Sequence, residues 1–110
     1  MNIDEFIKYV KENGLEDKRI FLSGAITSRL NTYKEHFGRI AKKLDENGLD
    51  YYNPATIDIS TSWKDSMRMT IRELLDSDIV YLLEGYEVSK GAKLEIEIAK
   101  ALGIEIIKEK

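Results

Sequence analysis

The stretch IVYLLEGYEVSKGAKLEIEIAKALGIEII, residues 79–107, decides the fold. It opens with five apolar residues at 79–83 that show no polar alternation, so they predict a strand covered on both faces. A loop at 84–90, a helix at 91–102 and, after Gly103, a last strand at 104–107 follow. A strand, a helix and a strand in this order predict a right-handed crossover between parallel strands.

The chain before residue 79 repeats the same alternation of strands and helices. The predicted elements are, in chain order, a helix at 3–13, a strand at 19–23, a long helix whose apolar stripe runs from Leu30 to Leu44, a strand at 50–53, a loop at 55–62 and a helix from Trp63 to Leu75. This order predicts one domain over residues 1–110. We expect a small three-layer α/β fold of the flavodoxin or Rossmann type, with about four parallel strands and an extra N-terminal helix.

Composition excludes several kinds of chemistry. The 110 residues include no cysteine and one histidine, which excludes disulfides, thiolate zinc sites, cysteine nucleophiles and polyhistidine metal sites. The histidine, His36, falls on the polar side of its helix, and we expect it to have no role. We therefore expect chemistry from carboxylates, hydroxyls, lysines and backbone groups, with no metal and no cofactor.

Charge and hydropathy limit the partners and the location. The formal net charge is -3 and the basic residues form no stripe, which argues against nucleic-acid binding. The longest apolar run has five residues, far fewer than the roughly 20 that a membrane span needs. The first residues do not resemble a signal peptide, so the expected location is the cytoplasm, with no membrane partner.

One glutamate of the helix at 91–102 lies where a surface residue should not. When the residues are placed at 100° steps, Glu95 falls inside the apolar arc, between Leu102 and Ala99. Glutamate is rarely buried unless a partner holds it or a reaction uses it. Two interpretations stay open, a carboxylate that the helix dipole or a neighbouring loop stabilises, and a functional carboxylate that faces a crevice.

The expected crevice lies at the carboxyl ends of the strands, where open parallel sheets bind ligands. The loops at 24–29 and 84–91 and the residues after Asn53 meet there. Gly91, one turn before Glu95, leaves room for a ligand to approach. Ser89 is a candidate N-cap of the helix, and free helix N–H groups at this point can also bind an anion such as phosphate.

Four segments together resemble the nucleoside 2-deoxyribosyltransferase-like superfamily, in particular a compact branch of it. The matching segments are the strand and loop IFLSGAI at 20–26, YNPA at 52–55, Leu74–Val80 with Asp78 before the third strand, and GYEVSKGAKLE at 85–95 with AKALG at 99–103. The resemblance covers residues 19–107, and the segment at 85–95 is its most specific part.

The resemblance implies a catalytic role for Glu95. In that superfamily a glutamate at this position attacks the anomeric carbon of a 2-deoxyribosyl group, expels the base and holds the sugar as an ester. A serine six residues earlier, here Ser89, holds a 5'-phosphate in the nucleotide-hydrolysing members. The remaining residues that we expect to bind substrate are Ser23, Gly24, Ala25, Ile26, Thr27, Thr70, Tyr86 and Gly91. For Tyr86, stacking on the base and a simple exposed loop position are both open.

The chain departs from the superfamily pattern at two positions. Thr70 stands where catalytic members carry an aspartate that protonates the departing base, and Phe21 stands where many carry a tyrosine. Threonine cannot act as an acid near neutral pH. The carboxylates considered as replacements are Asp65, Asp76, Asp78 and Glu87.

Three functions remain after these observations. The first is an N-glycosidase or deoxyribosyltransferase that acts on a nucleoside or its 5'-monophosphate. The second is a binding module that holds a nucleotide without cleaving it, an interpretation that Thr70 favours, and the third is a structural protein. Such a small chain has little left to build a lid, and the apolar residues Met69 and Tyr51 are expected to be exposed. We therefore expect a homodimer or a larger homo-oligomer.

Overall fold

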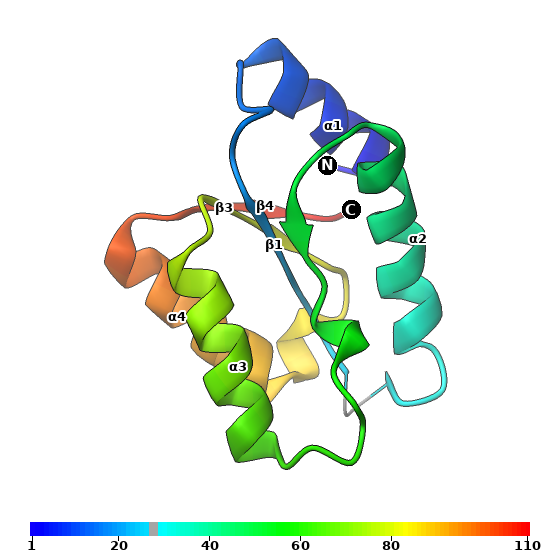
Figure 1. The fold of residues 1–110 in the computed structure, drawn as a ribbon, viewed down its shortest axis with the longest axis vertical. Helices are drawn as coiled ribbons and strands as arrows, with labels where there is room; N and C mark the ends of the chain where they lie inside the picture. The colour runs from blue at the N-terminus through cyan, green and yellow to red at the C-terminus, as the bar shows by residue number, and fades with distance from the viewer. Residues whose placement is uncertain (27–28) are drawn as a thin grey trace.

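A four-stranded parallel sheet forms the centre of the molecule (Figure 1). The computed structural model describes residues 1–26 and 29–110. Within them the strand order is β2-β1-β3-β4. The strands are β1 (Ile20–Ser23), β2 (Tyr51–Tyr52), β3 (Ile79–Leu82) and β4 (Glu105–Lys108). The prediction of a small α/β fold with about four parallel strands and an N-terminal helix is confirmed.

Four α-helices connect and cover the strands. They are α1 (Ile3–Glu12), α2 (Tyr33–Glu46), α3 (Trp63–Leu75) and α4 (Lys90–Leu102). The loops also contain short 3-10 helices at Pro54–Thr56 and Tyr86–Val88. In the part of the chain that the structure describes, no helix is long and apolar enough to cross a membrane.

Local sequence signals explain where the helices begin and end. Asn2 caps α1 in a capping box with Glu5, and Ser62 caps α3 by accepting a hydrogen bond from the Asp65 N–H. The helix α4 begins after Ser89 and ends at Gly103, whose φ of 71° lies in the left-handed region that favours glycine.

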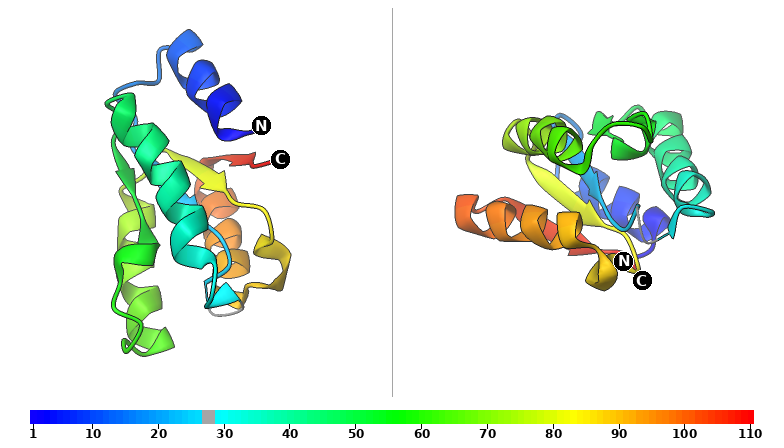
Figure 2. Two further views of the ribbon diagram at one scale, coloured as in Figure 1. Left: turned by 90° about the vertical axis from the view of Figure 1, so that its right-hand side faces the viewer. Right: turned by 90° about the horizontal axis from the view of Figure 1, so that it is seen from below.

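The two faces of the sheet carry separate apolar cores. Helices α1 and α2 cover one face and α3 and α4 cover the other (Figure 2). Because side chains alternate along a strand, Ile20 and Leu22 of β1 face the first core while Phe21 faces the second. All four residues of β1 and of β3 are buried, as the unbroken apolar run predicts for β3.

The N-terminal helix closes the first core. The ring of Phe6 in α1 stacks on that of Tyr81 in β3 with 4.4 Å between ring centroids. The Tyr81 hydroxyl donates to the carbonyl oxygen of Met1 at 2.8 Å, and the terminal amine of Met1 donates to that of Lys108, also at 2.8 Å. These bonds hold the two chain ends beside each other (Figure 2).

One expectation about an apolar residue is wrong. Leu30 precedes α2 instead of extending its stripe, and it is 55% exposed. The helix predicted from Trp63 to Leu75 is confirmed as α3. Its first and last residues are 43% and 56% exposed.

His36 does not line the cavity at the carboxyl ends of the strands but contacts a residue from the end of the chain. Its Nε2 lies 2.8 Å from Oε1 of Glu109, and the same oxygen accepts a hydrogen bond from the Glu84 N–H at 2.8 Å. The prediction considered only the position of His36 on its own helix. The segment after β4 brings Glu109 to that surface, across 73 residues of sequence.

Candidate functional site

A cavity opens at the carboxyl ends of the strands, where the parallel sheet predicts a ligand site. Its volume is about 150 Å³, which equals the volume of an engineered protein cavity that admits benzene. The loop after β1, the start of α2, the loop after β2, and helices α3 and α4 all contribute to its wall. The space therefore admits about one ring, and a larger ligand has to extend through the mouth.

Glu95 of α4 lies in the wall of this cavity and is only 6% exposed. The hydroxyl of Ser23, at the end of β1, donates a hydrogen bond to its Oε1 at 2.7 Å. Burial disfavours the charged carboxylate and raises its pKa to about 7, although the hydrogen bond from Ser23 and the nearby hydroxyl of Thr70 act in the opposite direction. Near neutral pH this carboxyl group is therefore divided between its acid and its anion.

The first turn of α4 forms the wall next to Glu95. Ser89 is buried, lines the cavity and accepts a hydrogen bond from the Ala92 N–H at 3.1 Å, so the predicted N-cap is confirmed. A side chain at Gly91 would point at the neighbouring helix, because its Cβ would lie 3.1 Å from the sulfur of Met67. The Nζ of Lys90 lies over the ring of Trp63, 4.5 Å from its centroid, at the start of the same helix.

The rest of the wall is largely apolar. It is formed by Ile26, Leu30, Tyr33, Ile57, Ile59, Trp63 and Met67. Leu30, Ile59 and Trp63 are exposed, since their side chains surround the opening. An apolar wall with one buried carboxyl suits a flat or ring-shaped ligand that has one reactive centre.

Asp58 is a second carboxylate in the wall, and the sequence interpretation missed it. It lies in the loop after β2, where its Oδ1 accepts hydrogen bonds from the N–H and the hydroxyl of Ser60, both at 2.8 Å. These bonds hold the pKa of Asp58 below its ordinary value, so it stays charged near neutral pH. The Asp-Ile-Ser spacing at 58–60 is a signal for this turn, but not for its position at a cavity.

The structure brings most of the predicted site residues together. Gly24, Ile26, Thr70, Ser89, Gly91 and Glu95 all line the cavity. Ser23 is fully buried behind the wall, where its hydroxyl contacts Glu95, and Ala25 is buried beside it without lining the cavity. Thr27 lies outside the described residues.

Tyr86 is placed elsewhere. It packs partly against the second core, with the Nζ of Lys108 5.5 Å from the centroid of its ring, and it does not line the cavity. This position fits the alternative of a loop aromatic better than stacking on a bound base.

The four carboxylates considered as the missing acid do not line the cavity. Asp65 is paired with Arg68, and Asp76 forms the C-cap of α3. Asp78 accepts a hydrogen bond from the Arg19 N–H at 3.0 Å, and Glu87 is exposed in the loop before α4. Within residues 1–26 and 29–110, no three His, Asp or Glu side chains gather as metal ligands would.

The sequence was compared with known protein families, curated proteins and solved structures. Residues 18–108 match the model of a family described as a domain of unknown function, DUF4406. No curated protein matches, and no solved structure matches. The match covers the sheet, helices α2–α4 and the whole cavity wall, and it leaves α1 outside.

Proposed function

The chain belongs to the DUF4406 family, and we propose that it is an enzyme. From the features of the cavity we infer that it cleaves the N-glycosidic bond of a nucleoside or a nucleoside 5'-monophosphate. The observation that carries this proposal is Glu95, a buried carboxyl group with a pKa of about 7 in the wall of a ring-sized cavity. The resemblance of residues 19–107 to nucleoside 2-deoxyribosyltransferases supports the same reaction.

In the proposed reaction Glu95 is the nucleophile. Its ionised carboxylate forms a bond to the anomeric carbon of the sugar, while the bond from that carbon to the base nitrogen breaks and its electron pair leaves with the base. The base takes a proton from water. A second water, or the N–H nitrogen of another base, then attacks the same carbon and gives up a proton to the hydroxide that the first water left. The ester bond breaks, and Glu95 regains its carboxylate.

Different parts of the site suit different parts of a nucleotide. One ring of the substrate fills the cavity beside Glu95, and the remainder passes the exposed side chains of Leu30, Ile59 and Trp63 at the mouth. A 5'-phosphate would lie at the start of α4, where Ser89 and Lys90 flank the helix N-terminus. The Ser89 hydroxyl accepts from Ala92, which leaves its own proton free to donate to the phosphate.

The direct test is a search for free base and for a covalent adduct. The purified protein is incubated with a panel of nucleosides and 5'-monophosphates, and released base is measured by chromatography. A slow 2-fluoro nucleoside analogue is then used to trap the ester, and mass spectrometry of the digested protein locates the added mass. An adduct on Glu95 supports the proposal, and a panel without any released base contradicts it.

The missing acid leads to a prediction at Thr70. Its side chain lines the cavity and lowers the pKa of Glu95, so an aspartate at this position would lie within reach of the same ligand. We expect Thr70→Asp to raise the rate of base release at least about tenfold at roughly pH 8, because a placed acid contributes about 10²–10⁴ in rate. The measurement is the rate of base release across a pH series.

Thr70→Asn is the matched control for this change. Asparagine has nearly the shape of aspartate but carries no acid, so we expect no gain in rate. The pH series is needed because a second carboxylate near Glu95 would raise the pKa of both groups. Equal rates for the Asp and Asn variants over the whole series would argue against an acid at this position.

A binding module is the second candidate function, and Thr70 in place of an acid favours it. The same cavity would then hold a nucleotide that stays intact. Titration calorimetry followed by chromatography of the ligand after long incubation separates the two functions. Tight binding with an intact ligand selects the binding module, and loss of the ligand selects the enzyme.

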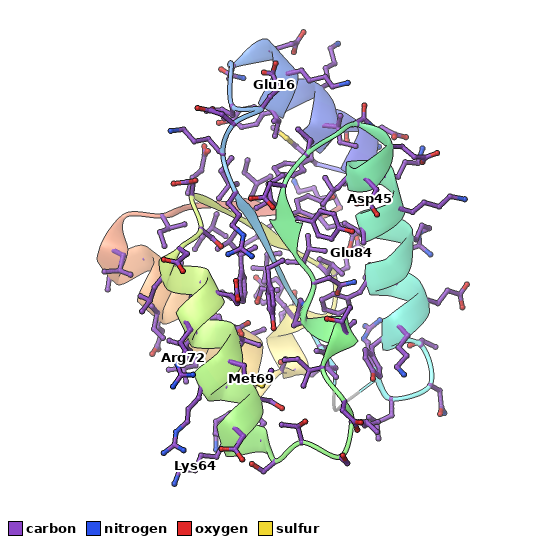
Figure 3. All side chains as sticks on the ribbon, viewed as in Figure 1. Glu16, Asp45, Lys64, Met69, Arg72 and Glu84 are labelled. Carbon is purple, nitrogen blue, oxygen red and sulfur yellow. The ribbon has the colours of Figure 1, made fainter. Side chains whose placement is uncertain are left out.

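We also propose that two copies of the chain associate. Met69 lies on α3 (Figure 3), and the residue is 44% exposed. The Tyr51 hydroxyl donates to Asp45 at 3.0 Å on another surface, so Tyr51 is partly satisfied within its own chain. Met69 is therefore the better candidate for an interface, and a monomeric mass by light scattering would exclude the association.

A further inference from the structure

We propose that Ser23 is a positioning residue, whose buried hydroxyl binds Oε1 of Glu95 and thereby leaves Oε2 as the oxygen that attacks the sugar. The proposal rests on the proposed function, because it assigns a task to Ser23 within that reaction. It replaces the expectation that Ser23 contacts the substrate itself.

Ser23 is held by an inner strand of the sheet. Strand β1 lies between β2 and β3 (Figure 1). Ser23 is its last residue, in register with Leu82 of β3. Its carbonyl oxygen accepts a hydrogen bond from the Leu83 N–H at 2.8 Å. The alternation of side chains along β1 puts Ser23 on the same face as Phe21, which is the face that α4 covers.

The hydroxyl of Ser23 is available to Glu95 and is closed to a ligand. The residue is 0% exposed and does not line the cavity, whereas Glu95 does. A hydroxyl has one proton to donate, and this proton is directed at Oε1 over 2.7 Å. A substrate in the cavity can therefore reach Glu95 without touching Ser23.

This bond makes the two carboxylate oxygens unequal. Oε1 is fixed as an acceptor, which limits rotation of the carboxyl group and lowers the electron density that Oε1 can offer to carbon. Oε2 is the oxygen that keeps its free electron pairs. When Glu95 is protonated, its proton lies on Oε2, so the attacking oxygen is also the one that titrates.

Few other groups affect the charge of Glu95. Desolvation and the hydroxyls of Ser23 and Thr70 act on it, and the charge of Glu95 in turn acts on Tyr52 of β2. The pKa of Tyr52 is raised, first by burial and then by the negative charges of Glu73 and Glu95. A change at Ser23 should therefore be visible in the titration of Glu95 itself.

The experiment compares Ser23→Ala with wild type in two measurements. The first follows the carboxyl carbon of Glu95 by NMR in protein with labelled glutamate, and Glu95→Gln identifies its signal. We expect Ser23→Ala to raise the pKa of Glu95 by about one to two pH units, because a hydrogen bond to a charged group contributes that much. The second measures kcat and KM for base release against pH.

For base release by Ser23→Ala we expect about a tenfold lower kcat with little change in KM. Most of the loss should persist at about pH 9, where at least about half of the variant's carboxyl is ionised and charge explains at most about a twofold loss, because positioning is then still missing. Ser23→Cys keeps a weak donor in a similar volume and should recover part of the rate. It also serves as the test variant if Ser23→Ala does not fold.

Three results would decide against the proposal. An unchanged Glu95 titration in Ser23→Ala would show that the hydroxyl does not hold the carboxylate. A kcat that equals wild type at about pH 9 would show that Ser23 tunes charge but does not position. No recovery in Ser23→Cys would also speak against a donor role. The NMR titration needs no substrate, so a failure of the proposed function itself appears separately, as absence of base release from wild type.

Discussion

Glu95→Gln is expected to lower base release by at least about a thousandfold, the range in which removal of a nucleophile falls. Glutamine has the shape of glutamate, and its amide oxygen can still accept the hydrogen bond from Ser23. The amide cannot form the ester, so the loss reports chemistry and not a change in shape. The measurement is the rate of base release with the best substrate of the panel.

Glu97→Gln is the matched control for this variant. It makes the same chemical change two residues away, on the exposed face of α4, and should keep the wild-type rate. In wild type we expect the rate to rise with pH through about 7, because only the ionised form of Glu95 attacks. Base release by Glu95→Gln at the wild-type rate would exclude Glu95 as the nucleophile.

The second large effect concerns the stability of the fold against pH. The pKa of Glu95 is raised from 4.5 to about 7 by burial, so the folded protein holds a proton that the unfolded chain releases. The stability that this proton contributes is fully present below about pH 4.5 and is lost as the pH rises through about 7. The loss amounts to about 3 kcal/mol, since each pH unit of difference corresponds to about 1.4 kcal/mol.

Urea unfolding at about pH 4.5 and pH 8 measures this loss. Glu95→Gln has no proton to release, so its free energy of unfolding should fall about 3 kcal/mol less than that of wild type between the two pH values. For each protein the change in free energy of unfolding between the two pH values is compared. Any cost of the substitution that does not depend on pH cancels in this comparison. Glu97→Gln should follow wild type, and parallel pH profiles for wild type and Glu95→Gln would show that folding does not shift the pKa of Glu95.

Most of the fold could be predicted because periodicity reports burial directly. The unbroken apolar run at 79–83 predicted a strand with both faces covered, and β3 is buried on both. The helical periodicity of residues 91–102 predicted that Glu95 faces inward, and it does. Both predictions depend only on the spacing of residues within one strand or helix, and that spacing indicates which side of the element is buried.

The missed features all depend on segments that meet from distant parts of the sequence. Asp58 reaches the cavity because the loop after β2 passes its opening, and no local spacing records that path. The pairing of His36 with Glu109 joins residues 73 positions apart. Leu30 was expected to belong to the apolar stripe of a helix, but it lies before α2 and lines the cavity as an exposed side chain.

The stack of Phe6 on Tyr81 shows that the segment shared with the family is shorter than the segment that forms the first core. The family match begins at residue 18, whereas the first core is completed by α1, which precedes it. A protein trimmed to the matched segment would expose one face of Tyr81 and leave its hydroxyl without the Met1 carbonyl that accepts from it. The boundary of the family match therefore runs through the first apolar core. A domain that begins at this boundary would expose an apolar surface beside β3.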